Sequence, residues 1–170
     1  MTGKDFGIKW LAYGLALLPV WFLHSFVLNR FPLCGVVPVL LPLAAAAVAM
    51  LEGALAGAGF GLAVGVLMDA VAPGPGGLMS FAVAAVGFGV GLLAQFALRQ
   101  DLVGCLVCSA LSLCVIDLFR ILPRLFLGTA PLVPMLRVAG LELGWSLVFV
   151  PPVYLLFRWV YNRVPKATVL

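Results

Sequence analysis

The chain has 170 residues, of which 65% are hydrophobic and only 9% are charged, and its mean hydropathy is +1.24. A soluble domain of this length cannot bury so much apolar surface, so the composition predicts a membrane protein. The apolar runs are continuous and do not alternate with polar residues, which favours helices over a membrane β-barrel. The net charge of +4 is small and spread along the chain, which argues against nucleic-acid binding.

Six apolar stretches approach the length of about 20 residues that a helix needs to cross a bilayer. We therefore expect one all-α membrane domain over residues 1–170, a compact bundle of six transmembrane helices. The expected spans are residues 8–28, 34–51, 53–71, 78–98, 102–119 and 141–160. The first lacks a cleavage-site pattern, so it is expected to be a retained helix and not a signal peptide. Pro38 and Pro42 predict a kink or a late helical start in the second span.

The third stretch carries small residues at every fourth position and then an acid. The series is Gly53, Gly57, Gly61, Gly65 and Asp69. Such a row forms a smooth groove that lets another helix approach closely in hydrocarbon. The occupant is expected to be either the fourth stretch, through Gly87 and Gly91, or a transmembrane helix of a partner. Asp69 needs a partner, water access or a function, because an ionisable group is costly inside a bilayer.

The basic residues favour cytoplasmic termini, because positive charge is enriched on the cytoplasmic side. With six spans, six basic residues lie on the side of the termini and four lie opposite. The first set is Lys4, Lys9, Arg99, Arg158, Arg163 and Lys166, and the second is Arg30, Arg120, Arg124 and Arg137.

A charge cluster is expected on the side opposite the termini. It consists of Asp117, Arg120, Arg124, Arg137 and Glu142. Asp117 and Arg120 are i, i+3 neighbours and can pair along a helix. The cluster is either a partner-docking or ligand site, or a set of end-of-helix charges that keeps the spans in register. Residues 120–137 mix Arg and Pro with large apolar residues, so they form either an interfacial segment at headgroup level or a plain loop.

Patterns for catalysis and metal binding are weak. His24 is the only histidine, so a serine nucleophile would have a single candidate base. Cys105 and Cys108 form a C-x-x-C motif, yet their surroundings are apolar and offer no further metal ligands. We interpret the cysteines as packing residues and expect no catalytic residue, no metal and no cofactor.

Several features together resemble the rod shape-determining protein MreD family. They are the glycine-rich third stretch ending in the phrase from Gly65 to Asp69, a Gly-rich turn, and a restart at Gly77-Leu78. The last stretch, with Pro151, Pro152, Tyr154 and Arg158 before a basic tail, is similar to the last helix of that family. Many members carry an Arg-Pro-Asp-like phrase before the second span, where this chain has Val36-Val37-Pro38.

The resemblance implies a non-catalytic part of the bacterial cell-elongation machinery in the cytoplasmic membrane. Such a protein would contact membrane lipid, bind MreC directly, and link MreB filaments to RodA and its class B penicillin-binding protein. The family is thought to resemble the S-components of energy-coupling-factor transporters, so a vitamin-binding S-component is the alternative. Such a transporter would line a cavity with polar side chains. The candidates are mainly Asn29, Asp69, Asp117, Arg120 and Trp145.

Overall fold

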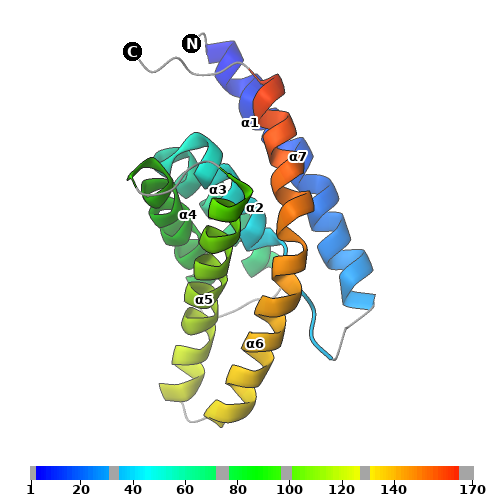
Figure 1. Ribbon diagram of the computed structural model, residues 1–170, viewed down its shortest axis with the longest axis vertical. Coiled ribbons are helices and arrows are strands. Elements are labelled where there is room, and N and C mark those ends of the chain that lie inside the picture. Colours follow the sequence, from blue (N-terminus) through cyan, green and yellow to red (C-terminus); the bar gives the residue numbers. More distant parts are fainter. Residues whose placement is uncertain (1–2, 31–34, 72–76, 97–100, 127–130, 165–170) are drawn as a thin grey trace.

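The computed structural model describes residues 3–30, 35–71, 77–96, 101–126 and 131–164, and its long elements are all helices (Figure 1). The helices are α1 (Gly3–Phe22), α2 (Leu41–Glu52), α3 (Ala54–Val71), α4 (Leu78–Phe96), α5 (Leu102–Phe126), α6 (Leu132–Val148) and α7 (Val150–Arg163). A π-helical turn over Leu23–Val27 and a 3-10 turn over Leu28–Arg30 prolong α1. The expected all-α class is confirmed.

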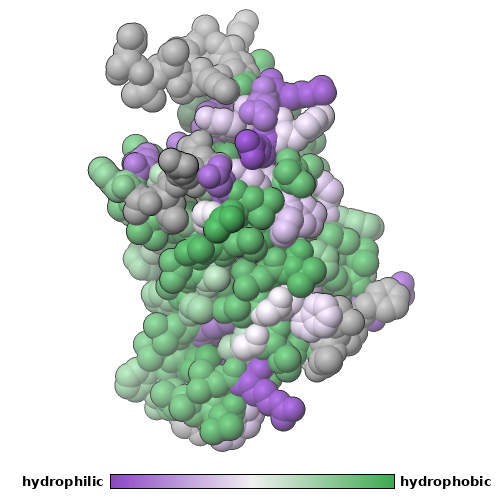
Figure 2. Space-filling model, in the orientation of Figure 1, coloured by the Kyte–Doolittle hydropathy of each residue, from purple (hydrophilic) through white to green (hydrophobic). Residues whose placement is uncertain are grey.

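Four helical segments are long and apolar enough to cross a membrane: Phe6–Val27, α3, α4 and α5. The pair α6 and α7 forms a fifth candidate, bent by 47°. The face in Figure 2 is mostly hydrophobic, and most of its hydrophilic side chains lie near the end where α1 begins and α7 ends. The chain is therefore a helical membrane protein with four or five helical spans among the described residues.

The second expected span, residues 34–51, is helical only in its second half. α2 begins at Leu41 and has 12 residues, about 18 Å of helix, which is too short for about 30 Å of hydrocarbon. Pro42 lies in its first turn, where the missing N–H costs nothing, so the late start is confirmed. Residues 35–40 before it are non-helical, and residue 34 lies outside the described residues.

α2 occupies the centre of the bundle. Every residue from Leu41 to Leu51 is buried, and the helix contacts α1, α3, α4, α5 and α7. A run of alanines over residues 44–47 gives it a thin cross-section, which lets the surrounding helices pack close to its axis. Gly53, with φ +94°, then ends α2 and turns the chain sharply into α3, a backbone conformation that favours glycine.

The third and fourth expected spans agree with α3 and α4 to within a residue wherever the structure describes the chain. The fifth does not, because α5 continues past the expected end at residue 119 as far as Phe126, with Pro123 inside it. α6 then begins at Leu132. The alternative of a plain loop over residues 120–137 is wrong for the described residues, because 120–126 belong to α5 and 132–137 to α6.

The sixth expected span, residues 141–160, is also corrected. The helix breaks at Phe149, and the span therefore takes in the second half of α6, the bend and most of α7. Pro151 and Pro152 follow in the first turn of α7, and neither can donate a backbone hydrogen bond to the preceding turn. An apolar run that looks continuous in sequence is thus two helices in space.

Candidate functional site

The glycine groove of α3 is occupied by α4. A Cβ atom added to Gly61 would lie 2.6 Å from the carbonyl oxygen of Val83, and one added to Gly57 would lie 2.6 Å from that of Gly87. Main-chain atoms of the facing helix block a Cβ at Gly65 and Gly91 in the same way. The two helices therefore touch backbone to backbone, which leaves no room for a partner's helix in this groove.

Asp69 joins the end of α3 to the beginning of α4. Its Oδ2 atom accepts hydrogen bonds from the backbone N–H of Ser80, at 3.0 Å, and from the Ser80 hydroxyl, at 2.5 Å. The first backbone N–H groups of a helix have no partner within the helix, so this carboxylate caps α4 from outside. Gly77, directly before α4, has φ +75°, a backbone conformation that favours glycine. The other carboxylate oxygen, Oδ1, is buried with no hydrogen-bond partner among the described residues.

A buried ion pair that the sequence analysis missed connects α1 to α2. Lys9 Nζ pairs with Glu52 Oε2, and the Tyr13 hydroxyl donates to Glu52 Oε1 at 2.6 Å. The Lys9 and Glu52 side chains are each 10% exposed, and Tyr13 is fully buried. Lys9 was counted among the basic residues on the side of the termini, and the structure shows its side chain buried against Glu52. The sequence gives one indication of this pair, since Lys9 and Glu52 both lie in apolar surroundings. That indication does not reveal a contact between residues 43 positions apart.

The non-helical residues 35–40 are fastened by two side chains from other elements. The Val39 N–H donates to the Ser146 hydroxyl at 2.9 Å, and His24 Nδ1 lies 3.1 Å from the Pro38 carbonyl oxygen. Since a carbonyl oxygen accepts, His24 donates from Nδ1. Non-helical backbone is tolerated at membrane depth only where protein or water satisfies its polar groups. Here His24 and Ser146 each form a hydrogen bond with one of these backbone groups.

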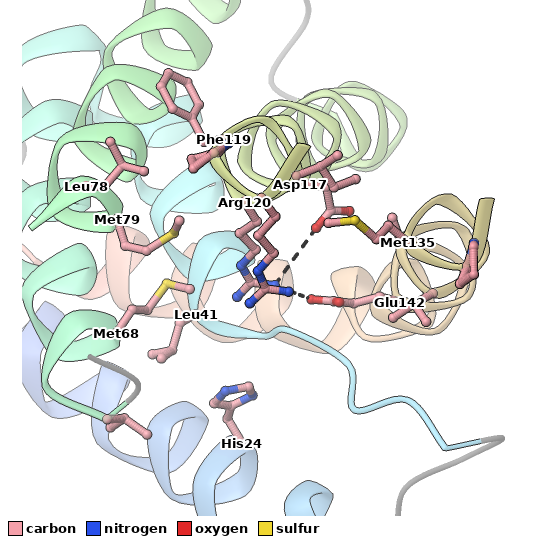
Figure 3. Close-up of a pocket in the computed structure, with 17 residues that line it drawn as sticks. His24, Leu41, Met68, Leu78, Met79, Asp117, Phe119, Arg120, Met135 and Glu142 are labelled. Carbon is pink, nitrogen blue, oxygen red and sulfur yellow. Dashed lines mark hydrogen bonds and ion pairs between the residues drawn. The ribbon is translucent and has the colours of Figure 1, made fainter. Parts of the chain in front are cut away.

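Four of the five residues in the expected charge cluster come together around one cavity of about 710 Å³ (Figure 3). They are Asp117, Arg120, Arg124 and Glu142. Arg120 Nη1 lies 2.7 Å from Glu142 Oε1 and 3.9 Å from Asp117 Oδ1. The fifth residue, Arg137, is exposed on α6 and does not line the cavity.

The rest of the cavity wall comes from apolar residues of α5 and α6 and from the ends of four other elements. His24 closes it from the π-helical turn after α1, Leu41 from the start of α2, Met68 from the end of α3, and Met79 from the start of α4. Figure 3 shows the Arg120 guanidinium in the middle of this space, with Glu142 on one side and Leu41 and Met68 on the other. The cavity is therefore apolar on most sides and charged along α5 and α6.

Two other polar candidates, Asp69 and Trp145, lie outside this cavity. Asp69 is not among the residues that line the cavity, and Trp145 borders a separate hollow of about 310 Å³ beside Gly140 and Gly144. The side chain of Asn29 lies outside the described residues. Within the described ranges, no three His, Cys, Asp or Glu side chains are placed to share a metal ion. Cys105 and Cys108 are buried in α5 as free thiols.

Comparisons of this chain with protein-family models, with curated proteins and with solved structures found no match.

Proposed function

We propose that this chain is a non-catalytic membrane scaffold of the bacterial cell-elongation machinery, of the kind that the MreD family represents. In this role it lies in the cytoplasmic membrane, binds MreC directly, and links MreB filaments to RodA and its class B penicillin-binding protein. The observation that carries the proposal is the contact between Asp69 and Ser80. Asp69 is the residue that matches the family pattern best, and through this contact it fixes α3 on α4.

The other charged contacts also favour a scaffold. Lys9 and Glu52 hold α1 on α2, and Arg120 and Glu142 hold α5 beside α6. Each pair joins two elements of the bundle, as expected of a protein that presents a rigid shape to its partners. Because α4 fills the glycine groove, direct binding of MreC in this proposal uses an outer face of the bundle.

We infer six passes, the second made of residues 35–52. The cavity brings together the ends of α1, α3 and α5 and the starts of α2 and α4. This arrangement is expected when successive spans cross the membrane in opposite directions. The start of α1 and the end of α7 lie at the same end of the molecule in Figure 1, which fits an even number of passes. We infer from the basic residues near the termini that this end faces the cytoplasm, because positive charge is enriched on that side.

Gentle detergent extraction of the tagged chain from its native membranes, followed by mass spectrometry, tests the proposal. An unrelated six-helix protein, extracted in parallel, is the control. We expect MreC, RodA and the partner synthase to be recovered with the tagged chain and not with the control. Their absence under conditions that preserve a known membrane complex would refute the scaffold role.

A second candidate function is the S-component of an energy-coupling-factor transporter. The observation in its favour is the cavity of about 710 Å³, which falls within the range of about 300 to 1,000 Å³ typical of small-molecule sites. Recovery of paired ATPases and a coupling membrane protein in the same extraction would support this function. Asp117 and Arg120 would then be substrate contacts, whereas Asp69 does not line the cavity.

A further inference from the structure

The cavity between α5 and α6 carries equal numbers of positive and negative side chains. Asp117, Arg120 and Arg124 line it from α5, and Glu142 lines it from α6. A simple anion would meet two carboxylates there, and a simple cation would meet two guanidinium groups. A ligand that carries one charge of each sign complements both pairs.

Arg120 is positioned to bind the negative part of such a ligand. Both of its ion pairs use the same nitrogen, Nη1, and its side chain is 31% exposed. A guanidinium has five N–H donors in a planar fork, so within the described part of the chain the donors beyond those on Nη1 remain to bind an anionic oxygen. Glu142 holds the guanidinium in place at 2.7 Å, which lowers the entropy lost when a phosphate binds.

The two carboxylates are positioned to bind the positive part. The Asp117 and Glu142 side chains are 12% and 13% exposed, so both are largely shielded from solvent. Each carboxylate can accept several hydrogen bonds, and Arg120 takes up part of that capacity. A primary ammonium group donates three hydrogen bonds and fits this site, whereas a quaternary ammonium donates none.

The opposite wall suits hydrocarbon chains. Met68 and Met79 line it, together with Leu41 and Leu78, and Met135 lies on the side of Asp117 and Glu142 (Figure 3). Methionine side chains are flexible and polarisable, so they adapt to a chain without a fixed shape. The cavity also lies among helices that are apolar enough to span a membrane, where phospholipids are the abundant amphiphiles.

We propose that this cavity binds one phospholipid with a phosphoethanolamine headgroup. The phosphate lies on the free donors of Arg120, the ammonium group lies between Asp117 and Glu142, and an acyl chain lies along the methionine wall. The lipid joins α5 and α6 to the ends of α3 and α4.

Native mass spectrometry tests this directly. The purified full chain is exposed to an equimolar mixture of phosphatidylethanolamine, phosphatidylcholine and phosphatidylglycerol of identical acyl chains, and the retained lipid is counted. We expect one phosphatidylethanolamine per chain. Arg120→Gln and Glu142→Gln are each expected to lower its retention by about tenfold, the effect of losing a charged hydrogen bond. Arg137→Gln, a loss of positive charge on α6 outside the cavity, is expected to retain the lipid.

Because Arg120→Gln leaves Glu142 without its partner, Met135→Trp provides a second variant with the ion pairs intact. Its larger side chain fills part of the cavity and is expected to displace the lipid without unfolding the protein, as judged by gel filtration. Preferential retention of phosphatidylglycerol, or equal retention of phosphatidylcholine, would overturn the proposed headgroup. Equal retention by wild type, Arg120→Gln and Met135→Trp would overturn the site. Displacement by free phosphoethanolamine would overturn the role of the apolar wall.

Discussion

The carboxylate of Asp69, at the last turn of α3, accepts two hydrogen bonds from Ser80, one from its backbone N–H and one from its hydroxyl. This contact closes the hairpin at the end where the helices meet through a turn. The glycines of α3 bring the backbones together along the rest of the interface. The acid thus fixes the register of a helix pair whose smooth surfaces do not define one by themselves.

Replacement of Asp69 by Ala is expected to lower the free energy of unfolding by about 0.5 to 2 kcal/mol, as for the loss of a helix cap. Asp69→Asn keeps an acceptor oxygen and is expected to lose less. Unfolding in mixed micelles by titration with sodium dodecyl sulfate measures these effects. Ser80→Ala, alone and with Asp69→Ala, completes a double-mutant cycle. Purely additive losses in this cycle would contradict the hydrogen bond from the Ser80 hydroxyl, the one that Ser80→Ala removes.

A methyl group at Gly61 is expected to be far more disruptive than one at Gly59, although both residues lie on α3. At Gly61 the new Cβ meets the carbonyl oxygen of Val83 at 2.6 Å, whereas nothing lies within 4 Å at Gly59. Gly61→Ala is expected to cost about 1 to 3 kcal/mol from overpacking, and Gly61→Leu more. Gly59→Ala is expected to be neutral or stabilising by up to about 1 kcal/mol through helix propensity.

Thermal unfolding in detergent compares the two glycine variants, and recovery of MreC, the partner proposed above, compares their assembly. Because the groove is internal, we expect Gly61→Leu to lose MreC only together with folding. Normal expression and normal partner recovery by Gly61→Leu would contradict close packing of α3 on α4.

Removal of one member of the Lys9–Glu52 pair is expected to destabilise the fold by about 3 to 5 kcal/mol, because the remaining charge stays buried without its partner. The double variant Lys9→Met with Glu52→Leu is expected to recover much of the loss, since both charges are then gone. The same micelle titration measures all three proteins. Single-variant losses below about 1 kcal/mol would indicate that the pair is solvated, as surface pairs are.

Apolar runs and glycine spacing predict the location of most of the helices. Over the described residues, the third and fourth spans were placed within a residue of α3 and α4, because the Gly- and Pro-rich stretch between them marks a clear boundary. Hydropathy fails where an apolar run changes conformation without a change in composition. Residues 35–40 are as apolar as α2, and Phe149 interrupts one continuous run. Proline positions predicted the first of these two breaks and would have predicted the second.

The candidate site was predicted as a set of charges and not as a cavity. Arg120 and Asp117 lie one turn apart on one helix, so sequence spacing finds their proximity. Glu142 belongs to another helix, and its contact with Arg120 depends on how α6 packs beside α5. The same limit applies to Lys9 and Glu52, because charges in apolar runs do not reveal their partners. His24 and Ser146 form hydrogen bonds with the non-helical segment. The sequence suggested that segment only through Pro38, so it could not predict these two contacts.

Ser146 is expected to matter more for stability than Ser112, although both side chains are buried. The Ser146 hydroxyl accepts from the N–H of Val39, a backbone group in a segment with no helical ladder of its own. Ser146→Ala leaves that donor unsatisfied, at an expected cost of about 1 to 3 kcal/mol. The Ser112 hydroxyl donates to the Cys108 carbonyl within α5. That carbonyl still accepts a backbone N–H of the helix when the hydroxyl is removed, so Ser112→Ala is expected to change stability by less than about 1 kcal/mol.

Amide hydrogen exchange across residues 35–40 separates the role of Ser146 from a general loss of stability. Ser146→Ala is expected to raise exchange at Val39 while the amides of α3 and α4 stay protected. Equal exchange at Val39 in the Ser146→Ala and Ser112→Ala proteins would show that the hydroxyl does not hold the segment. The non-helical residues would then depend on burial and His24 alone, and His24→Ala would become the variant that frees them.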